Sequence, residues 1–141
     1  MASFVLDASV AFSWCFPGDP TENTPYSRAV LKRLEQADAL VPEIWPFEIA
    51  NSIFVSFARR KRITEAQISE YLQSLRLLPI RVEHQDLWTS LSLETLARKH
   101  QLTAYDASYL DLARRLDLPL ATADEPLKKA ALASGVKLVN P

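Results

Sequence analysis

The chain has 141 residues, of which 48% are hydrophobic and 23% are charged, and its formal net charge is −1. These values are typical of one globular domain with a real core, and we expect a single domain over residues 1–141. They neither indicate nor exclude nucleic-acid binding, because basic residues around a site are averaged away in the net charge. The single cysteine, Cys15, excludes an intramolecular disulfide and a multi-cysteine zinc site.

The sequence gives no sign of a membrane or an export route. No apolar stretch reaches the roughly 20 residues that a membrane-spanning helix needs. The first residues also lack the basic region and long apolar core of a secretory signal. We therefore expect a cytoplasmic protein with no membrane partner.

Short apolar runs alternate with longer runs of helical periodicity, which is typical of an α/β fold around a parallel sheet. The run at residues 4–6 is apolar at consecutive positions, as expected for a strand whose two faces are both covered. In chain order we predict strand 4–6, helix 26–37, strand 39–41, helix 47–61, helix 64–78, strand 79–82, helices 86–100 and 103–116, strand 118–122, helix 124–134 and strand 136–139.

Four carboxylates lie where an ordinary surface charge is not expected. Asp7 ends the first predicted strand, and Asp124 follows the fourth. Glu48 interrupts a strongly apolar helical stretch, and Asp106 falls on the apolar side of its helix. Because ligands of open parallel sheets bind beyond the carboxyl ends of the strands, folding can gather such acids into one cluster.

Each acid also has a simpler structural explanation. Asp7 and Asp124 both precede sequences that suit the start of a helix, so each could be only an N-cap. Glu48 shares a helical stripe with Asn51, and this stripe is either the solvated side of the helix or the lining of a cleft.

Asp106 can be compared with a second acid on its own helix. Asp111 is spaced to form an i,i+4 ion pair with Arg115 on the predicted solvent side, whereas Asp106 aligns with the apolar positions. The competing explanation for Asp106 is a capping box with Thr103.

A cluster of carboxylates is stable only when a cation offsets the repulsion among the negative charges. Magnesium and manganese bind hard oxygen ligands and commonly serve phosphate chemistry. The conjunction of the four acids therefore indicates a site for Mg²⁺ or Mn²⁺.

Four segments of the chain, in family order, closely resemble the PIN-domain nucleases, and more narrowly the VapC toxins of type II toxin–antitoxin pairs. The third segment is long and distinctive, and the match runs nearly from end to end. The segments are residues 5–11, 42–52, 105–113 and 120–124.

The resemblance implies a PIN-like three-layer α/β/α sandwich with a central parallel sheet of about four to five strands, and a metal-dependent endoribonuclease. It also implies a homodimer and a VapB-like antitoxin that covers the acidic cleft. In this resemblance the catalytic and metal-binding quartet is Asp7, Glu48, Asp106 and Asp124, and the supporting polar residues are Ser9, Asn51 and Thr122.

One basic run, Arg59, Arg60, Lys61 and Arg62, either places favourable charge at a helix C-terminus or contacts RNA phosphates. The main alternative to a nuclease is a PIN-like module that binds RNA or protein without cutting. A receiver domain or a haloacid-dehalogenase-type phosphatase fits less well, because no second acid lies beside Asp7 and position 9 is a serine.

Overall fold

The computed structural model describes residues 3–141. Four strands and eight helical segments follow the alternating order that the sequence predicts. Their bounds in chain order are β1 Phe4–Leu6, α1 Ala8–Ser13, α2 Pro25–Arg33, β2 Ala39–Pro42, α3 Trp45–Phe54, the π-helical turn η1 Val55–Arg59, α4 Glu65–Arg76, β3 Ile80–Glu83, α5 Leu87–His100, α6 Ala104–Leu116, β4 Leu120–Ala121 and α7 Glu125–Ala133.

The sheet has the order β3-β2-β1-β4, and every neighbouring pair is parallel. In this order β1 lies between β2 and β4, and its three residues are completely buried. A parallel strand covered on both faces needs apolar side chains at consecutive positions, which is what Phe4–Leu6 provides. The pairing of β1 with β4 aligns Leu6 with Ala121, so both chains leave the sheet at the same edge.

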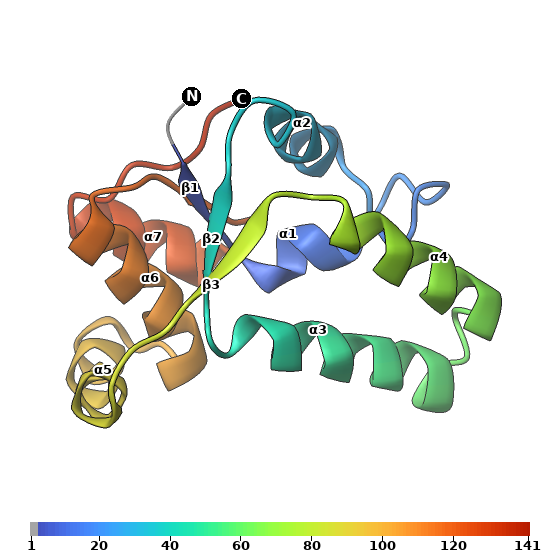
Figure 1. The fold of residues 1–141 in the computed structure, drawn as a ribbon. Helices are drawn as coiled ribbons and strands as arrows, with labels where there is room; N and C mark the ends of the chain where they lie inside the picture. The colour runs from blue at the N-terminus through green and yellow to red at the C-terminus, as the bar shows by residue number, and fades with distance from the viewer. Residues whose placement is uncertain (1–2) are drawn as a thin grey trace.

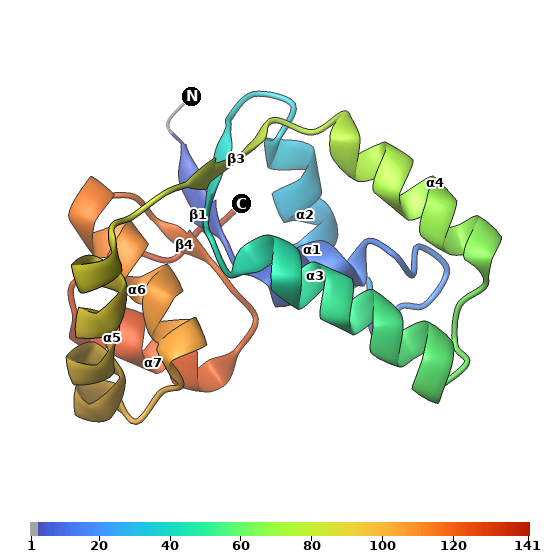
Figure 2. The same ribbon diagram turned by 60° about the horizontal axis from the view of Figure 1, so that its bottom comes forward.

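Helices cover both faces of the sheet and complete three layers. Helices α5, α6 and α7 lie on one side of the sheet, and α1 to α4 lie on the other (Figures 1 and 2). Helix α6 packs directly on β1, β2 and β4 and buries Tyr109, Leu110 and Leu112. On the opposite side, the hydroxyl of Tyr71 in α4 donates to the carbonyl of Ala11 in α1 at 2.6 Å. The predicted three-layer α/β/α sandwich around a parallel sheet is confirmed, with four strands in the described residues.

Residues that favour the start or the end of a helix lie where the sequence predicts them. Thr64 and Gln67 form a complete capping box at the start of α4. Pro46 lies in the first turn of α3, where its missing N–H has no cost. Gly135 follows α7 with a φ of 75°, a left-handed conformation that glycine adopts without strain.

Two predicted helices differ from the structure at their ends. Helix 26–37 ends at Arg33, because residues 34–36 form tighter bonds to the carbonyl three residues back. Helix 47–61 begins at Trp45 and continues beyond Phe54 as the π-helical turn. The chain then reverses at Lys61, whose φ is 51°.

The predicted fifth strand is reduced to a single bridge. Leu138 pairs with Leu120 in parallel, but residues 136–139 form no ladder. The reason lies in β4, which has only two residues and therefore offers few backbone groups for a further neighbour. The short helix α1 was not predicted as a separate element, because six residues are too few for a periodic pattern.

Within residues 3–141, no helix is both long enough and apolar enough to cross a lipid bilayer.

Candidate acidic site

Asp7 is a buried carboxylate at the carboxyl end of the central strand, with 5% of its surface exposed. Its Oδ2 atom accepts hydrogen bonds from the hydroxyls of Ser9 at 2.8 Å and Thr122 at 2.7 Å. Its Oδ1 atom accepts only a long bond of 3.4 Å from the Ser9 N–H at the start of α1. Asp7 is therefore the N-cap of α1, and Oδ1 is its less occupied oxygen.

Thr122 links the two acids that follow β1 and β4. The Thr122 hydroxyl donates to Asp7, and it accepts the backbone N–H of Asp124 at 3.1 Å. Asp124 also caps α7, because its Oδ2 atom accepts the N–H of Leu127 at 3.0 Å. A hydroxyl that both donates and accepts fixes the two strand ends relative to each other.

Glu48 enters the site from the first turn of α3. Its Oε1 atom accepts a hydrogen bond of 2.5 Å from the hydroxyl of Tyr109, a fully buried residue of α6. The same hydroxyl accepts the N–H of Ala8 at 3.3 Å. Tyr109 thus joins α6, α3 and the start of α1, and it leaves the Oε2 atom of Glu48 unengaged by this contact.

Asp106 and Asp111 lie on different sides of α6, as the sequence predicts. The N–H of Asp106 donates to the Thr103 hydroxyl at 3.0 Å, and the Asp106 side chain is half-buried. Asp111 instead pairs with Arg115 at 2.8 Å. The N-cap at Thr103 accounts for the start of the helix, but it leaves the Asp106 carboxylate close to the other acids.

Asp7 and Asp106 lie within electrostatic range of each other and of both Asp124 and Glu48. Burial raises the pKa of Asp7, and the nearby charge of Asp124 raises it further, against the lowering effect of the two hydroxyl donors. Burial likewise raises the pKa of Asp106, with the charges of Asp7 and Asp124 adding to the effect. For Glu48 burial again raises the pKa, the Tyr109 hydrogen bond opposes it, and the charges of Asp7 and Asp106 reinforce it.

These acids fit a hard divalent cation by their chemistry. Within residues 3–141, no three acidic, histidine or cysteine side chains are close enough to hold a metal ion as they stand. Mg²⁺ keeps several of its waters and is usually bound through one or two carboxylates, so a tight protein cage is not required. A cation among these acids would also relieve the mutual repulsion that contributes to their raised pKa values.

The supporting residues and the basic run that the sequence predicts differ in how they relate to the four acids. Ser9 contacts Asp7 directly, and Asn51 is exposed on α3 one turn after Glu48. The basic run begins eleven residues after Glu48, which places Arg59 about 16 Å further along the helix. Arg62 is paired with Glu22 at 3.0 Å, so part of the run stabilises the loop before α2.

Tyr109 is the contact that the sequence did not reveal as part of the site. Its position in the third motif and on the apolar side of α6 indicates only a core aromatic residue. A buried tyrosine hydroxyl usually has a hydrogen-bond partner, and this is the signal that could have identified it. Its partner, Glu48, is 61 residues away in the sequence and becomes a neighbour only in the fold.

The structure is an α/β fold with two acids, Asp7 and Asp124, at the carboxyl ends of neighbouring parallel strands and two more, Glu48 and Asp106, on the helices α3 and α6. The sequence matches the family model of the PIN domain over residues 4–132, and the chain therefore belongs to the PIN-domain family. The family resemblance of the four motifs is thus confirmed. A comparison with curated proteins finds no significant match.

Solved structures agree with this fold. The crystal structure of PAE2754 from Pyrobaculum aerophilum is similar with a TM-score of 0.66 and 24% identity, over 92% of this chain and 87% of that chain. The crystal structure of FitAcB from Neisseria gonorrhoeae is similar with a TM-score of 0.58 and 19% identity, over 100% and 98% of the two chains.

We expect Tyr109→Phe to weaken the site while preserving the packing of the ring. Glu48 and the Ala8 N–H would each lose a partner, so the free energy of unfolding should fall by about 1–3 kcal/mol. Mn²⁺ affinity should fall about tenfold, as for other groups that orient metal ligands. Denaturant unfolding and calorimetric Mn²⁺ titration measure both effects. Tyr105→Phe, at an exposed position on the same helix, is the control; equal behaviour of the two variants would contradict the role of Tyr109.

The raised pKa values predict how the metal-free protein responds to pH. A carboxyl whose pKa is higher in the folded than in the unfolded state stabilises the fold at low pH, and this contribution is lost as the pH rises above about 4. Asp7→Asn should therefore raise the midpoint of thermal unfolding near neutral pH by roughly 2–4 °C and make its pH dependence shallower.

Divalent metal separates this effect from a general change in charge. Mg²⁺ or Mn²⁺ should raise the unfolding midpoint of the unmodified protein and raise that of Asp7→Asn much less. Asp38→Asn is the matched control, because Asp38 is exposed and precedes β2 at the opposite edge of the sheet. An Asp7→Asn protein that is less stable than Asp38→Asn at every pH would contradict this prediction.

Proposed function

We propose that this protein is a metal-dependent endoribonuclease that hydrolyses RNA phosphodiester bonds, and that it acts as the VapC-like toxin of a type II toxin–antitoxin pair. The observation that supports the proposal is a PIN-domain fold in which the charges of Asp7, Asp106 and their neighbours Glu48 and Asp124 influence one another. PIN domains are generally nucleases, which supports a hydrolase. We further propose that residues 1–141 act as one domain in the cytoplasm.

The proposed roles come from the family resemblance, and the hydrogen bonds of the carboxylate oxygens are compatible with them. Asp7 and Asp106 would hold Mg²⁺ or Mn²⁺, and Asp7 has Oδ1 available because its two hydroxyl donors share Oδ2. Asp124 would complete the site, since only its Oδ2 atom is used in capping α7. The bound cation would supply charge neutralisation at the phosphate and acidify a water molecule.

Glu48 is suited to a different task. Tyr109 fixes its Oε1 atom, so Oε2 can orient a water molecule or accept its proton. Ser9 and Thr122 would act through Asp7 by holding its carboxylate in one orientation. Asn51 lies one turn after Glu48 on α3 and would support the acidic site from the same helix.

Protein partners belong to the same proposal. We propose a homodimer and a cognate VapB-like antitoxin that blocks the acidic cleft, on the strength of the family resemblance. Large apolar side chains that a protein partner could cover are exposed on two helices, with Phe47 and Phe54 on α3 and Trp88 and Leu91 on α5. The alternative is a PIN-like module that binds RNA or protein without cutting, and it predicts that loss of an acid has no effect on RNA.

Two acids on one helix provide a matched test of catalysis. Asp106→Asn should lower the rate of RNA cleavage by more than about 100-fold, because changes to groups that merely support metal ligands already cost about 10–100-fold. Asp111→Asn removes the same charge from a different side of α6, where the carboxylate pairs with Arg115, and should retain activity. Cleavage of a labelled RNA by purified protein with added Mg²⁺ or Mn²⁺ measures both rates.

Chelation provides the control for contaminating nucleases. Cleavage by the unmodified protein should stop in EDTA and return with excess Mg²⁺ or Mn²⁺. Activity that persists in EDTA, or that is equal in Asp106→Asn and Asp111→Asn, would overturn the assignment.

Mapping of RNA ends in cells tests the toxin proposal. A brief pulse of expression should create a small set of new RNA 5′ ends that are absent when Asp7→Asn is expressed. Co-expression of the cognate antitoxin should suppress these ends. Identical maps for the two chains, with folded protein and no antitoxin present, would favour the non-cutting alternative.

A further inference from the structure

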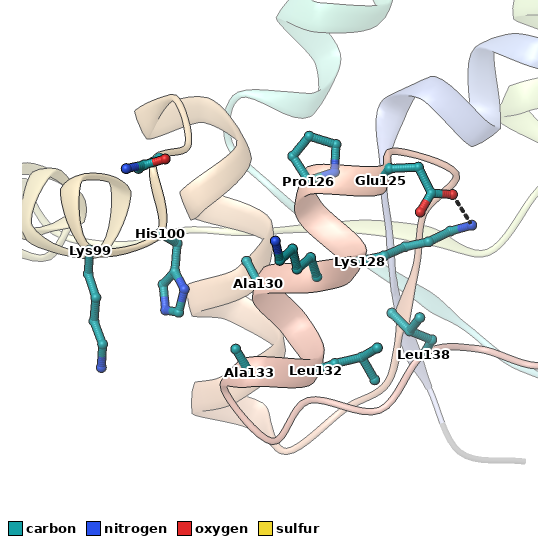
Figure 3. A pocket seen from close by; sticks show the side chains of 11 residues that line it. Lys99, His100, Glu125, Pro126, Lys128, Ala130, Leu132, Ala133 and Leu138 are labelled. Atoms are coloured by element: carbon teal, nitrogen blue, oxygen red, sulfur yellow. Dashed lines mark hydrogen bonds and ion pairs between the residues drawn. The ribbon is translucent and has the colours of Figure 1, made fainter.

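A hollow of about 900 Å³ lies along the outer side of α7 and reaches the C-terminal end of α5 (Figure 3). We call it the α7 hollow. Three lysines and a histidine line it, whereas its only carboxylate is that of Glu125. The basic residues are Lys99 and His100 from α5, and Lys128 and Lys129 from α7.

The α7 hollow begins beside the acidic site. Asp124 is the N-cap of α7, and the next two residues, Glu125 and Pro126, already line the hollow. Lys128 and Lys129 follow Asp124 by four and five residues, which is about 6–7.5 Å along the helix axis. Positive charge therefore starts one helical turn from the carboxylate cluster.

The lysines are available to an incoming anion. Lys99 and Lys129 are exposed. Lys128, with 33% of its side chain exposed, pairs at 3.3 Å with Glu125, whose side chain is 84% exposed, and a pair with one solvated partner contributes little. His100 is held by a contact of 3.2 Å between its Nε2 atom and the Ser134 hydroxyl, so it forms a fixed part of the wall.

The basic run after α3 is less suited to the same task. Arg62 is engaged by Glu22 and lies 4.5 Å from the ring centre of Phe16, and Arg59 lies over Phe54. Arg59 is also about 16 Å along the helix from Glu48. A negatively charged strand must approach four carboxylates, and adjacent positive charge offsets that repulsion where it is strongest.

We infer that the α7 hollow is the binding path for the RNA strand as it leaves the acidic site, with Lys99, Lys128 and Lys129 contacting its phosphates. The inference rests on the proposed ribonuclease function. Among the described residues, those that line the hollow include no Phe, Tyr or Trp. Aromatic side chains on which RNA bases could stack are therefore absent from this lining. The α7 hollow therefore supplies affinity that is independent of base sequence.

Binding of a short labelled single-stranded RNA of mixed sequence tests the inference. Fluorescence anisotropy is measured over a range of salt concentrations, in chains that also carry Asp7→Asn so that the RNA stays intact. Lys128→Gln combined with Lys129→Gln should weaken binding about tenfold or more near 0.1 M salt. The slope of log affinity against log salt should become shallower by about 0.7 for each lost phosphate contact.

Two further double variants separate this path from net charge and from the rival surface. Lys32→Gln with Lys137→Gln removes the same charge from two exposed positions outside the hollow and should change the affinity less than about twofold. Equal weakening by this control would overturn the inference. So would weakening confined to Arg59→Gln with Arg60→Gln, which would place the RNA along α3.

The outcomes also separate this inference from the proposed function. If the unmodified protein cleaves RNA and the Lys128 and Lys129 variant binds it normally, only the α7 path is wrong. If the unmodified protein does not cleave RNA and the Asp7→Asn chain does not bind it, both proposals are wrong. Thermal unfolding of each variant confirms that its fold is intact.

Discussion

The parallel pairing of β1 with β4 is the constraint on which the acidic site depends. It brings two chain segments more than one hundred residues apart to the same edge of the sheet, so that Asp7 and Asp124 follow neighbouring strands. The hydroxyl of Thr122 then connects them through one donated and one accepted hydrogen bond. The backbone N–H of Asp124 donates to Thr122 after β4, and the side chain of Asp124 accepts from Leu127 at the start of α7. Both backbone and side-chain contacts therefore fix the position of Asp124.

The same constraint explains why the caps and the site are not alternatives. Asp124 caps α7 through Oδ2 alone, and Asp7 caps α1 only through a long bond of 3.4 Å to Oδ1, so each cap leaves acceptor capacity on its carboxylate. A helix N-terminus favours negative charge, so the caps help to keep two acids close together. The α3 and α6 helices add Glu48 and Asp106 from outside the sheet, and the Tyr109 hydroxyl connects these two helices at the level of Glu48.

Local patterns predicted most of the fold and the residues of the candidate site. The apolar run at Phe4–Leu6, the capping box at Thr64 and the stripe that separates Asp106 from Asp111 all depend on neighbouring residues, which a sequence displays directly. The family motifs added Ser9 and Thr122, and the structure brings both against Asp7.

What the sequence could not predict depends on distant partners. The hydrogen bond from Tyr109 to Glu48 joins residues that are 61 positions apart in the sequence. The loss of the fifth strand depends on the short length of β4. The lysines of the α7 hollow come together only when α5 and α7 both pack against α6. Helix ends were the least accurate boundaries, because tight turns and the π-helical turn leave no periodic signature.

The π-helical turn after α3 has a consequence for how this chain can change in evolution. The N–H of Arg60 bonds to the carbonyl of Val55, five residues back, so the turn encloses one residue more than an α-helical turn. Deletion of one residue there would restore the i→i−4 hydrogen-bond spacing of a regular α-helix, because the π turn already accommodates the extra residue within its wider ring. Glu48 lies before the turn and would keep its orientation. A one-residue change of length after α3 can therefore be absorbed in this turn without moving the acid in the first turn of α3.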